Sequence, residues 1–432
     1  MSMQGPTHRP AVRRAPLGRR LERRAKRTLL PLAAALWPPR PAPPDADLAA
    51  VRRILLVRQD NRLGNLVLMI PFLQAVRASF PQARIGLLLS DHYAAVHAES
   101  PWVDEQICER KRWLIRHPHA YPRHLATLRH GAWDLAFELS NPDTHSFYNA
   151  FLTVISGAPR RIGFAHPRSR SALSTPIAPP HRETHYALAP LLLLSALGAS
   201  PDVPPLRLPP RSPAAGNGPT PPTGDRLLIH PGGRGAKRWP EERFAELIRG
   251  LPPELAERLT LIGSPGEAPR LQALAAASPG GAEVHLLRNL PALIAALQNA
   301  RLYLGCDAGP MHLAVALGVP TLALFRTSHP LRYAPLGEIH ETLLLGEQSR
   351  GLAAAEFFPA PAEGKAAPPV LWNPAFGARL AAQRPRCITP PTSLDEAHEA
   401  AFVLERLGQR WKVTAAGDGR AGGGGAQAGS TS

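Results

Sequence analysis

The sequence is poor in cysteine and has no pattern typical of a metal site. Only three cysteines, Cys108, Cys306 and Cys387, occur in 432 residues, and they stand far apart. Isolated cysteines form neither a disulfide framework nor a metal-binding motif, and they favour a reducing compartment. No cluster of His, Cys, Asp and Glu has metal-ligand spacing, so we predict no metal and no cofactor.

Long apolar runs are also missing. The most suggestive segment, TLLPLAAALWPP at residues 28–39, has an apolar part of about ten residues, whereas a helix that spans a bilayer needs about 20. This segment follows a basic stretch. It therefore predicts at most a short interfacial anchor, with Leu29, Leu30, Leu32 and Trp37 in the lipid and arginines on the headgroups.

Acidic residues are few compared with basic ones, 33 against 50, which gives a net charge of +17. Twelve Lys or Arg residues and three acidic residues precede Ile54, so an amino-terminal arm carries much of this charge. Such an arm is compatible with nucleic acid, an anionic membrane surface or a solvated tail. Because no nucleic-acid motif follows, we predict no nucleic-acid partner and retain the other two interpretations.

Short apolar runs alternate with helical patterns, and this alternation predicts an α/β fold of two doubly wound, Rossmann-like domains. We expect one helix over residues 66–80 and another over residues 186–197. The predicted organisation is a basic tail (1–50), a first domain (51–205), a Pro-rich linker (206–224), a second domain (225–348), an atypical insertion (349–392), a closing helix (393–412) and a disordered tail (413–432).

The loop HPGGRGAKRWP at residues 230–240 follows a predicted strand of the second domain. Ligands of open α/β sheets bind outside the carboxyl ends of the strands. Gly232 and Gly233 allow close backbone approach, and Lys237 brings positive charge, so the loop suits a diphosphate. A solvated turn is the alternative interpretation.

A second candidate loop lies in LGCDAGPMHLAVALGVP at residues 304–320. Gly309 opens a helix whose amino terminus carries partial positive charge and would suit phosphate. Asp307 either binds a ligand or caps this helix by accepting its first amides. His312 is either a ligand contact or a core histidine.

Three segments carry a family resemblance: RILLVRQDNRLGNLVLMIPFLQAVRASFPQARI, HPGGRGAKRWPEERFAELI and YLGCDAGPMHLAVALGVPTLALF. In order and spacing they resemble the heptosyltransferase family of glycosyltransferases, the lipopolysaccharide core transferases, from about Arg52 to Pro335. The resemblance implies a GT-B fold, with an acceptor domain, a nucleotide-sugar domain and a final helix that returns to the first domain. Ser393 and Glu396 in SLDE would form the capping box of that helix.

The resemblance also implies donor-binding roles. Lys237 corresponds to the family's diphosphate-contacting lysine, and Glu267 to the acidic residue that holds the donor ribose. The donor-binding segment at the helix start corresponds to Asp307, Ala308, Gly309 and His312. The family usually has Ser or Thr where this chain has Ala308, so a hydroxyl to the phosphate is missing while the backbone amide remains.

On the acceptor side, relatives often carry Arg or Lys followed by Ser where this chain has His145 and Ser146. The weaker charge suggests a less phosphorylated acceptor, and an ordinary surface pair is the alternative. Asn61, Arg62 and His185, with Tyr186 beside it, are further candidates for acceptor contacts.

The implied reaction is inverting glycosyl transfer, which needs a base for the acceptor hydroxyl. Many relatives have Gly-Asp where this chain has Gly64 and Asn65, and an amide cannot accept that proton. Asp60 is the only carboxylate nearby. It is either the base, with Asn65 orienting the acceptor, or a helix cap or ion-pair partner of Arg62.

We therefore expect a glycosyltransferase with an ADP-heptose-like, nucleotide-diphosphate sugar donor. A glycolipid, lipopolysaccharide or other surface polysaccharide is the expected acceptor, and the expected place is the cytoplasmic membrane face, with peripheral attachment. Three alternatives stay open: an inactive sugar-nucleotide-binding homologue, a sugar-nucleotide epimerase of similar architecture, and a basic nucleic-acid-binding protein.

Overall fold

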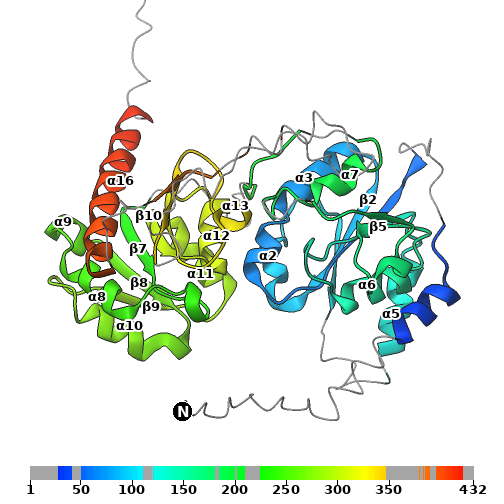
Figure 1. Ribbon diagram of the computed structural model, residues 1–432, viewed down its shortest axis with the longest axis horizontal. Coiled ribbons are helices and arrows are strands. Elements are labelled where there is room, and N and C mark those ends of the chain that lie inside the picture. The colour runs from blue at the N-terminus through cyan, green and yellow to red at the C-terminus, as the bar shows by residue number, and fades with distance from the viewer. Residues whose placement is uncertain are drawn as a thin grey trace, which may run out of the picture.

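The computed structural model describes residues 28–40, 50–109, 119, 121–180, 184–199, 202–209, 224–346, 379, 383, 385–389 and 396–421. Two α/β domains lie side by side, with the amino-terminal half of the chain in one and the carboxyl-terminal half in the other (Figure 1). No helix within these described ranges is long and apolar enough to cross a membrane.

The first domain has a parallel sheet of six strands in the order β3-β2-β1-β4-β5-β6. These strands are β1 (Arg53–Arg58), β2 (Arg84–Ser90), β3 (Glu105–Glu109), β4 (Leu135–Glu138), β5 (Arg160–Phe164) and β6 (Thr175–Ile177). Its helices are α2 (Leu63–Val67), α3 (Ile70–Ser79), α5 (Tyr121–His130), α6 (Phe147–Ile155) and α7 (Leu191–Ser195). The central strands are buried on both faces, which is why they are continuous apolar runs in the sequence.

The second domain repeats this plan with the strand order β13-β12-β11-β10-β7-β8-β9, again all parallel. The strands are β7 (Arg226–His230), β8 (Leu259–Gly263), β9 (Glu283–Leu286), β10 (Ala300–Cys306), β11 (Thr321–Phe325), β12 (His340–Leu344) and β13 (Cys387–Ile388). The helices are α8 (Glu241–Arg249), α9 (Pro253–Ala256), α10 (Ala268–Ala275), α11 (Leu290–Gln298), α12 (Gly309–Ala316), α13 (Pro330–Tyr333) and α16 (Glu399–Ala421).

Both sheets reverse their strand order once, so the predicted doubly wound fold is confirmed. The reversal lies between β1 and β4 in the first domain and between β7 and β10 in the second. In such folds the loops that leave the two central strands diverge and open a crevice for ligands. Each domain therefore offers one binding position, and the predicted site loops are the ones that border it.

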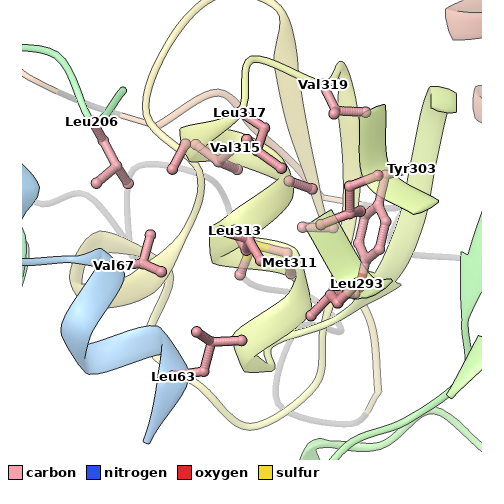
Figure 2. Close-up of a cluster of buried hydrophobic side chains, with 14 of the residues drawn as sticks. Leu63, Val67, Leu206, Leu293, Tyr303, Met311, Leu313, Val315, Leu317 and Val319 are labelled. Carbon is pink, nitrogen blue, oxygen red and sulfur yellow. The ribbon is translucent and has the colours of Figure 1, made fainter. Parts of the chain in front are cut away.

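The two domains share an apolar seam. Leu63 and Val67 of α2 belong to the same buried cluster as Met311 and Leu313 of α12. Figure 2 shows the two side chains of α2 pointing toward α12. Since burial of one leucine side chain contributes about 1.5–3 kcal/mol, this seam stabilises the juxtaposition of the two crevices.

Two predicted helices are shorter than expected because prolines begin new helices within them. Residues 66–80 divide between α2 and α3, and Pro71 occupies the first turn of α3. Pro190 is the N-cap of α7, so residues 186–190 precede that helix instead of forming its first turns. Proline lacks an amide hydrogen, which a helix interior needs and a first turn does not.

The closing helix differs from its prediction in place and in length. The buried side chains of α16, among them Val403, Leu407 and Trp411, pack into the core of the second domain. Figure 1 shows α16 on the side of that domain away from the first one, so the expected return is wrong. The helix continues to Ala421, well into the tail predicted as disordered from residue 413. Ser393, half of the expected capping box, lies outside the described residues.

Two other segments contribute secondary structure to the domains. In the basic tail, residues 28–36 form a helix that packs on α6. Its Leu30 is 1% exposed within the protein, so the expectation that this side chain enters lipid is wrong. In the predicted insertion, β13 extends the second sheet beside β12. Leu206, the first residue of the predicted linker, is buried and packs into the cluster of the domain seam, and residues 210–223 lie outside the described residues.

Glu399 anchors the closing helix and generates a stability prediction. Its buried carboxylate accepts hydrogen bonds from Trp239 Nε1 at 2.9 Å and from the Gly346 amide at 2.8 Å. We expect Glu399→Leu to leave both donors unpaired and to lower the free energy of unfolding of this domain by about 2–4 kcal/mol in chemical denaturation. Glu405→Leu, on the exposed face of the same helix, should change it by less than about 0.5 kcal/mol. Equal losses in both variants would contradict the anchoring role.

Candidate active site

The predicted site residues gather where the two crevices face each other. Asp60 and Asn65 follow β1, and His145 lies in the loop after β4. Lys237 follows β7, and the segment from Asp307 to His312 follows β10. The order reversal of each sheet therefore explains why loops distant in sequence meet at one place.

Lys237 and Asp307 form the centre of the second-domain half. Lys237 Nζ lies 2.6 Å from Asp307 Oδ2, and the Ser328 hydroxyl donates to the same carboxylate oxygen. His312 Nε2 lies 3.4 Å from the other oxygen, Oδ1. Burial alone would raise the pKa of Asp307, but the hydrogen bond and charge of His312, together with the charge of Lys237, hold it well below its usual range. The result is a fixed carboxylate that positions two cationic or hydrogen-bonding side chains.

This arrangement excludes the capping role of Asp307 and shows where His312 lies. The N-cap of α12 is Ala308, and no side chain caps the helix, so the capping role of Asp307 is wrong. His312 is buried, yet its ring lies between Asp307 and the backbone of Gly64 in the other domain. His312 is thus a buried histidine that is paired with a carboxylate at the domain boundary, and its contact with a ligand stays a prediction.

Close approach at this boundary depends on two glycines. A Cβ atom at Gly64 would lie 2.7 Å from His312 Cδ2, and one at Gly309 would lie 2.9 Å from Leu63 Cβ. Any larger residue at either place would push the domains apart. The amino terminus of α12, with Ala308 as its N-cap, therefore lies directly against α2 of the first domain.

The loop after β7 packs around a second carboxylate, Glu267. A Cβ atom at Gly232 would lie 2.4 Å from the ring of His230 and 3.2 Å from Glu267 Oε1. Glu267 forms a capping box with Ser264 and accepts from Arg270 Nη2 at 2.6 Å. His230 was missed in the sequence, although it ends β7 beside the glycines. Burial lowers its pKa to about 4, and Nδ1 has no hydrogen-bond partner among the described residues.

Gly233, on the same loop, packs on Arg238, where a Cβ atom would lie 3.1 Å from the arginine Cα. Gly232 is buried and both glycines pack against neighbouring residues, so the approach of a diphosphate to their backbone stays a prediction. In the described ranges no group of three or more His, Cys, Asp or Glu is placed to hold a metal ion.

In the first-domain half, Asp60 and Asn65 contact each other. Asn65 Nδ2 donates to Asp60 Oδ2 at 2.6 Å, and the Arg62 amide donates to Oδ1 at 3.0 Å. The ion-pair partner of Asp60 is Arg58, at 3.6 Å, and not the Arg62 guanidinium. The Asp60 side chain keeps 21% of its surface exposed. Asp60 thus stabilises its own turn, and its role as a base stays a prediction.

Arg58 is a buried residue that the sequence analysis overlooked. Its guanidinium donates to the carbonyl of Leu139 and, at 2.6 Å, to Asn141 Oδ1, and so ties the loop after β4 to β1. Nearby, Glu138 at the end of β4 is fully buried and accepts from the amide and hydroxyl of Ser140. A small cavity lined by Arg58, Asn65, Ser140 and Asn141 lies between these groups.

The acceptor-side candidates separate into accessible and occupied residues. Asn61 and Arg62 are exposed, and Asn61 Oδ1 accepts from the Ser90 hydroxyl at 2.6 Å. His145 is partly exposed and stacks on His166 with ring centroids 5.0 Å apart. Burial, together with the charges of His166 and Arg168, lowers the pKa of His145 to about 4. His145 is therefore neutral at pH 7 and would bind an acceptor by hydrogen bonds.

The other two candidates are engaged in the fold. Ser146 is the N-cap of α6, because its hydroxyl accepts from the Asn149 amide at 3.2 Å. His185 is buried, and its Nε2 lies 3.0 Å from the Ala334 carbonyl oxygen of the second domain. The structure gives both residues a structural role, and their acceptor contacts stay predictions.

A polar clamp next to His185 joins the domains and reaches the Lys237 side chain. Arg332 of α13 donates to Asp143 and to the Tyr186 hydroxyl in the first domain. The neighbouring Tyr333 presents its ring to Lys237 Nζ at 5.0 Å from the centroid. These contacts were not predictable locally, since each joins positions far apart in the sequence.

Comparison with known proteins supports a transferase. The model of the family described as glycosyltransferase family 9 (heptosyltransferase) matches residues 122–351, more than half of the chain. The match includes the loops of Lys237 and Asp307 but not Asp60 and Asn65. No curated protein matches the sequence.

Solved structures show the same fold at low identity. The glycosyl transferase family 9 from Veillonella parvula is 21% identical with a TM-score of 0.58, and 70% of this chain and 88% of that one are covered. E. coli ADP-heptose lps heptosyltransferase II is 19% identical (TM-score 0.55; 67% and 89% covered). E. coli heptosyltransferase WaaC with ADP-2-deoxy-2-fluoro heptose is also 19% identical (TM-score 0.52; 67% and 92% covered). The predicted GT-B fold is thereby confirmed.

Glu138 makes the stability of the first domain depend on pH. Burial, opposed by the Ser140 hydrogen bonds and by Arg58, raises its pKa from 4.5 to about 7. Between these two values the folded chain holds a proton that the unfolded chain has lost, so Glu138 lowers stability as pH rises through this window. We expect Glu138→Gln to stabilise the protein relative to wild type by up to about 3 kcal/mol at pH 8 and little at pH 4.5.

The measurement is chemical denaturation at a series of pH values, with Glu257→Gln, an exposed carboxylate, as the control. The control should differ from wild type by an amount that does not change with pH. A stability difference for Glu138→Gln that stays flat from pH 5 to pH 8 would contradict the raised pKa.

Proposed function

We propose a reaction for this chain from the premise that it belongs to glycosyltransferase family 9 (heptosyltransferase). In this proposal it transfers a heptose or related sugar from a nucleotide-diphosphate donor, with inversion at the anomeric carbon. The acceptor is a lipopolysaccharide or another surface glycan. One observation carries the proposal: the Lys237–Asp307–His312 group lies against the segment of the Asp60–Asn65 pair across the domain boundary, where His312 contacts Gly64. One side supplies charge for a leaving diphosphate, and the other supplies a carboxylate for an incoming hydroxyl.

The donor half has the features that a diphosphate needs. The Lys237 side chain is 40% exposed, so its ammonium group can leave Asp307 partly and contact phosphate oxygens. The amino terminus of α12 adds the partial charge of its dipole and the backbone amides of Ala308 and Gly309. When the bond from the anomeric carbon to the diphosphate breaks, these groups stabilise the negative charge that develops on the leaving oxygen.

The remainder of the donor would lie along the loop after β7. Gly232 and Gly233 let the nucleotide approach the backbone, and Glu267 accepts from the ribose hydroxyls. Glu267 would exchange part of its contact with Arg270 for the ribose, since the carboxylate has two oxygens. The heptosyltransferase structure with ADP-2-deoxy-2-fluoro heptose supports an ADP-heptose-like donor.

Asp60 is the base in this proposal. The acceptor hydroxyl gives its proton to a carboxylate oxygen of Asp60 while its oxygen bonds to the anomeric carbon from the face opposite the diphosphate. The Asn65 side-chain amide donates a hydrogen bond to Asp60 Oδ2, and Arg58 Nη2 lies 3.6 Å from the same Asp60 oxygen. Asn61, Arg62 and His145 line the approach of the acceptor.

We place the reaction at the inner face of the cytoplasmic membrane, where a glycolipid acceptor would present its headgroup. One observation favours a second candidate, a sugar-nucleotide-binding homologue without turnover. This observation is Asn65, which stands where the family usually has an aspartate. The binding of donor and the transfer of sugar therefore need separate tests.

The donor site predicts the effect of Lys237→Ala. Loss of the charge-assisted contact should weaken the binding of a nucleotide sugar by roughly 1.5–3 kcal/mol in titration calorimetry. Arg238→Ala is the matched control, because its guanidinium faces Glu241 at 4.0 Å, and it should cost less than about 0.5 kcal/mol. Unchanged affinity in Lys237→Ala would reject the assignment of this lysine to the diphosphate.

The base proposal predicts the effects of Asp60→Asn and Asn65→Asp. Asp60→Asn should lower turnover by about two to four orders of magnitude and leave donor affinity within a few-fold. Asn65→Asp would place two carboxylates at hydrogen-bond distance, so the acidic limb of its pH–rate profile should move to higher pH. Full turnover in Asp60→Asn combined with faster turnover in Asn65→Asp would show that Asp60 is structural. Donor binding without transfer by the wild type and both variants would favour the inactive homologue.

A further inference from the structure

The helix at residues 28–36 has two apolar faces, and only one of them is covered. On the inner face Leu30, Ala33 and Ala34 pack against Ala150 and Val154 of α6. Figure 1 shows this helix, in dark blue, beside α5 and α6 at the outer side of the first domain. The inner face alone accounts for the attachment of the helix to the domain.

The outer face carries a leucine stripe, which we define as Leu29, Leu32 and Leu36. These side chains are 47%, 59% and 64% exposed, and they are three of the six large hydrophobic residues exposed in the described part of the chain. Their spacing of three and four residues places them on one side of the helix. A contiguous exposed apolar stripe of this kind marks an interaction surface more often than a single exposed leucine does.

The stripe is held in place before any partner binds. Arg161, a buried residue of β5, donates from Nη2 to the Trp37 carbonyl oxygen at 2.6 Å, where the helix ends. Arg129 of α5 lies over the Trp37 ring, 4.7 Å from its centroid. The helix is therefore a rigid part of the first domain, and a partner that binds the stripe also fixes the orientation of that domain.

Charge indicates the partner. Residues 1–27, which lead directly into the helix, contain nine Lys or Arg and one acidic residue. On the domain itself, Arg168 and Arg170 are exposed in the segment that ends at Ala172, which packs on the inner face of the helix. Interfacial helices on anionic lipid combine an exposed apolar face with basic residues, and here the sequence directly before the helix supplies those residues.

We propose that the leucine stripe docks on an anionic lipid bilayer, with the leucine side chains in the acyl boundary and the basic residues on the headgroups. A second copy of this chain is a poor occupant, because a symmetric contact would bring two strongly basic segments together. Docking needs no donor or acceptor, so it stands or fails independently of the transfer reaction.

If the proposed function holds, docking also orients the acceptor approach. His145 lies two residues before α6, the helix that carries the residues 28–36 helix on its surface. The loop of His145 and the leucine stripe therefore belong to the same part of the first domain. An acceptor sugar on a lipid would meet the crevice while its lipid stays in the bilayer.

The test is vesicle flotation of the full-length protein. We would compare wild type with the triple variant Leu29→Ser, Leu32→Ser, Leu36→Ser on vesicles of phosphatidylcholine with phosphatidylglycerol and of phosphatidylcholine alone. The matched control is Leu286→Ser, Ile339→Ser, Val413→Ser, which removes the other three exposed hydrophobic side chains, all in the second domain. Thermal unfolding of each protein checks that the fold is kept.

We expect wild type and the control to bind the anionic vesicles within about twofold of each other, and the stripe variant to bind at least about tenfold less. Wild type should bind the neutral vesicles weakly. Equal binding by the stripe variant would overturn the proposal, because the basic residues alone would then suffice. A wild-type protein that does not bind anionic vesicles would overturn it too, and so would a dimer in light scattering that the stripe variant converts to monomer.

Discussion

The whole site depends on the close contact between α2 and α12, which two glycines permit. Gly64 leaves room for the His312 ring, and Gly309 leaves room for Leu63. Because Asn65 follows Gly64 directly, this contact sets the Asp60–Asn65 pair of the first domain beside the Lys237–Asp307–His312 group of the second. The apolar seam of Leu63 and Val67 and the Arg332 clamp then hold the two crevices in register.

The sequence predicted the central part of the fold well because parallel strands buried on both faces are unbroken apolar runs. RLLIH of β7 and PTLALF around β11 are examples. Helices and strands that contain many polar residues were not predicted, because they lack a clear apolar pattern. The edge strand β3 reads EQICE, and α5 contains four basic residues in ten, so neither stood out. The position of α16 was also beyond local reasoning, since its amphipathic pattern does not say which domain receives the apolar face.

Site residues were predictable where a local motif carries them. Lys237 and Asp307 stand in recognisable loops, but their pairing joins positions 70 residues apart, and that pairing replaced the local capping role expected for Asp307. Arg58 and Glu138 were missed for the related reason that both are buried by the fold. In the sequence they look like ordinary charges at strand ends. The donor and acceptor roles themselves rest on the family resemblance and stay predictions.

The contact between Asp60 and Asn65 suggests why this chain lacks the family's usual aspartate. The two side chains are 2.6 Å apart, with the amide donating to the carboxylate. A carboxylate at both positions would bring two negative charges to that distance, and one of them would have to hold a proton at neutral pH. A carboxylate at position 60 therefore favours a donor at position 65, and the amide of Asn65 is one. The pair of Asp60 and Asn65 therefore holds one carboxylate and one amide donor in direct contact, two residues after β1 and within α2.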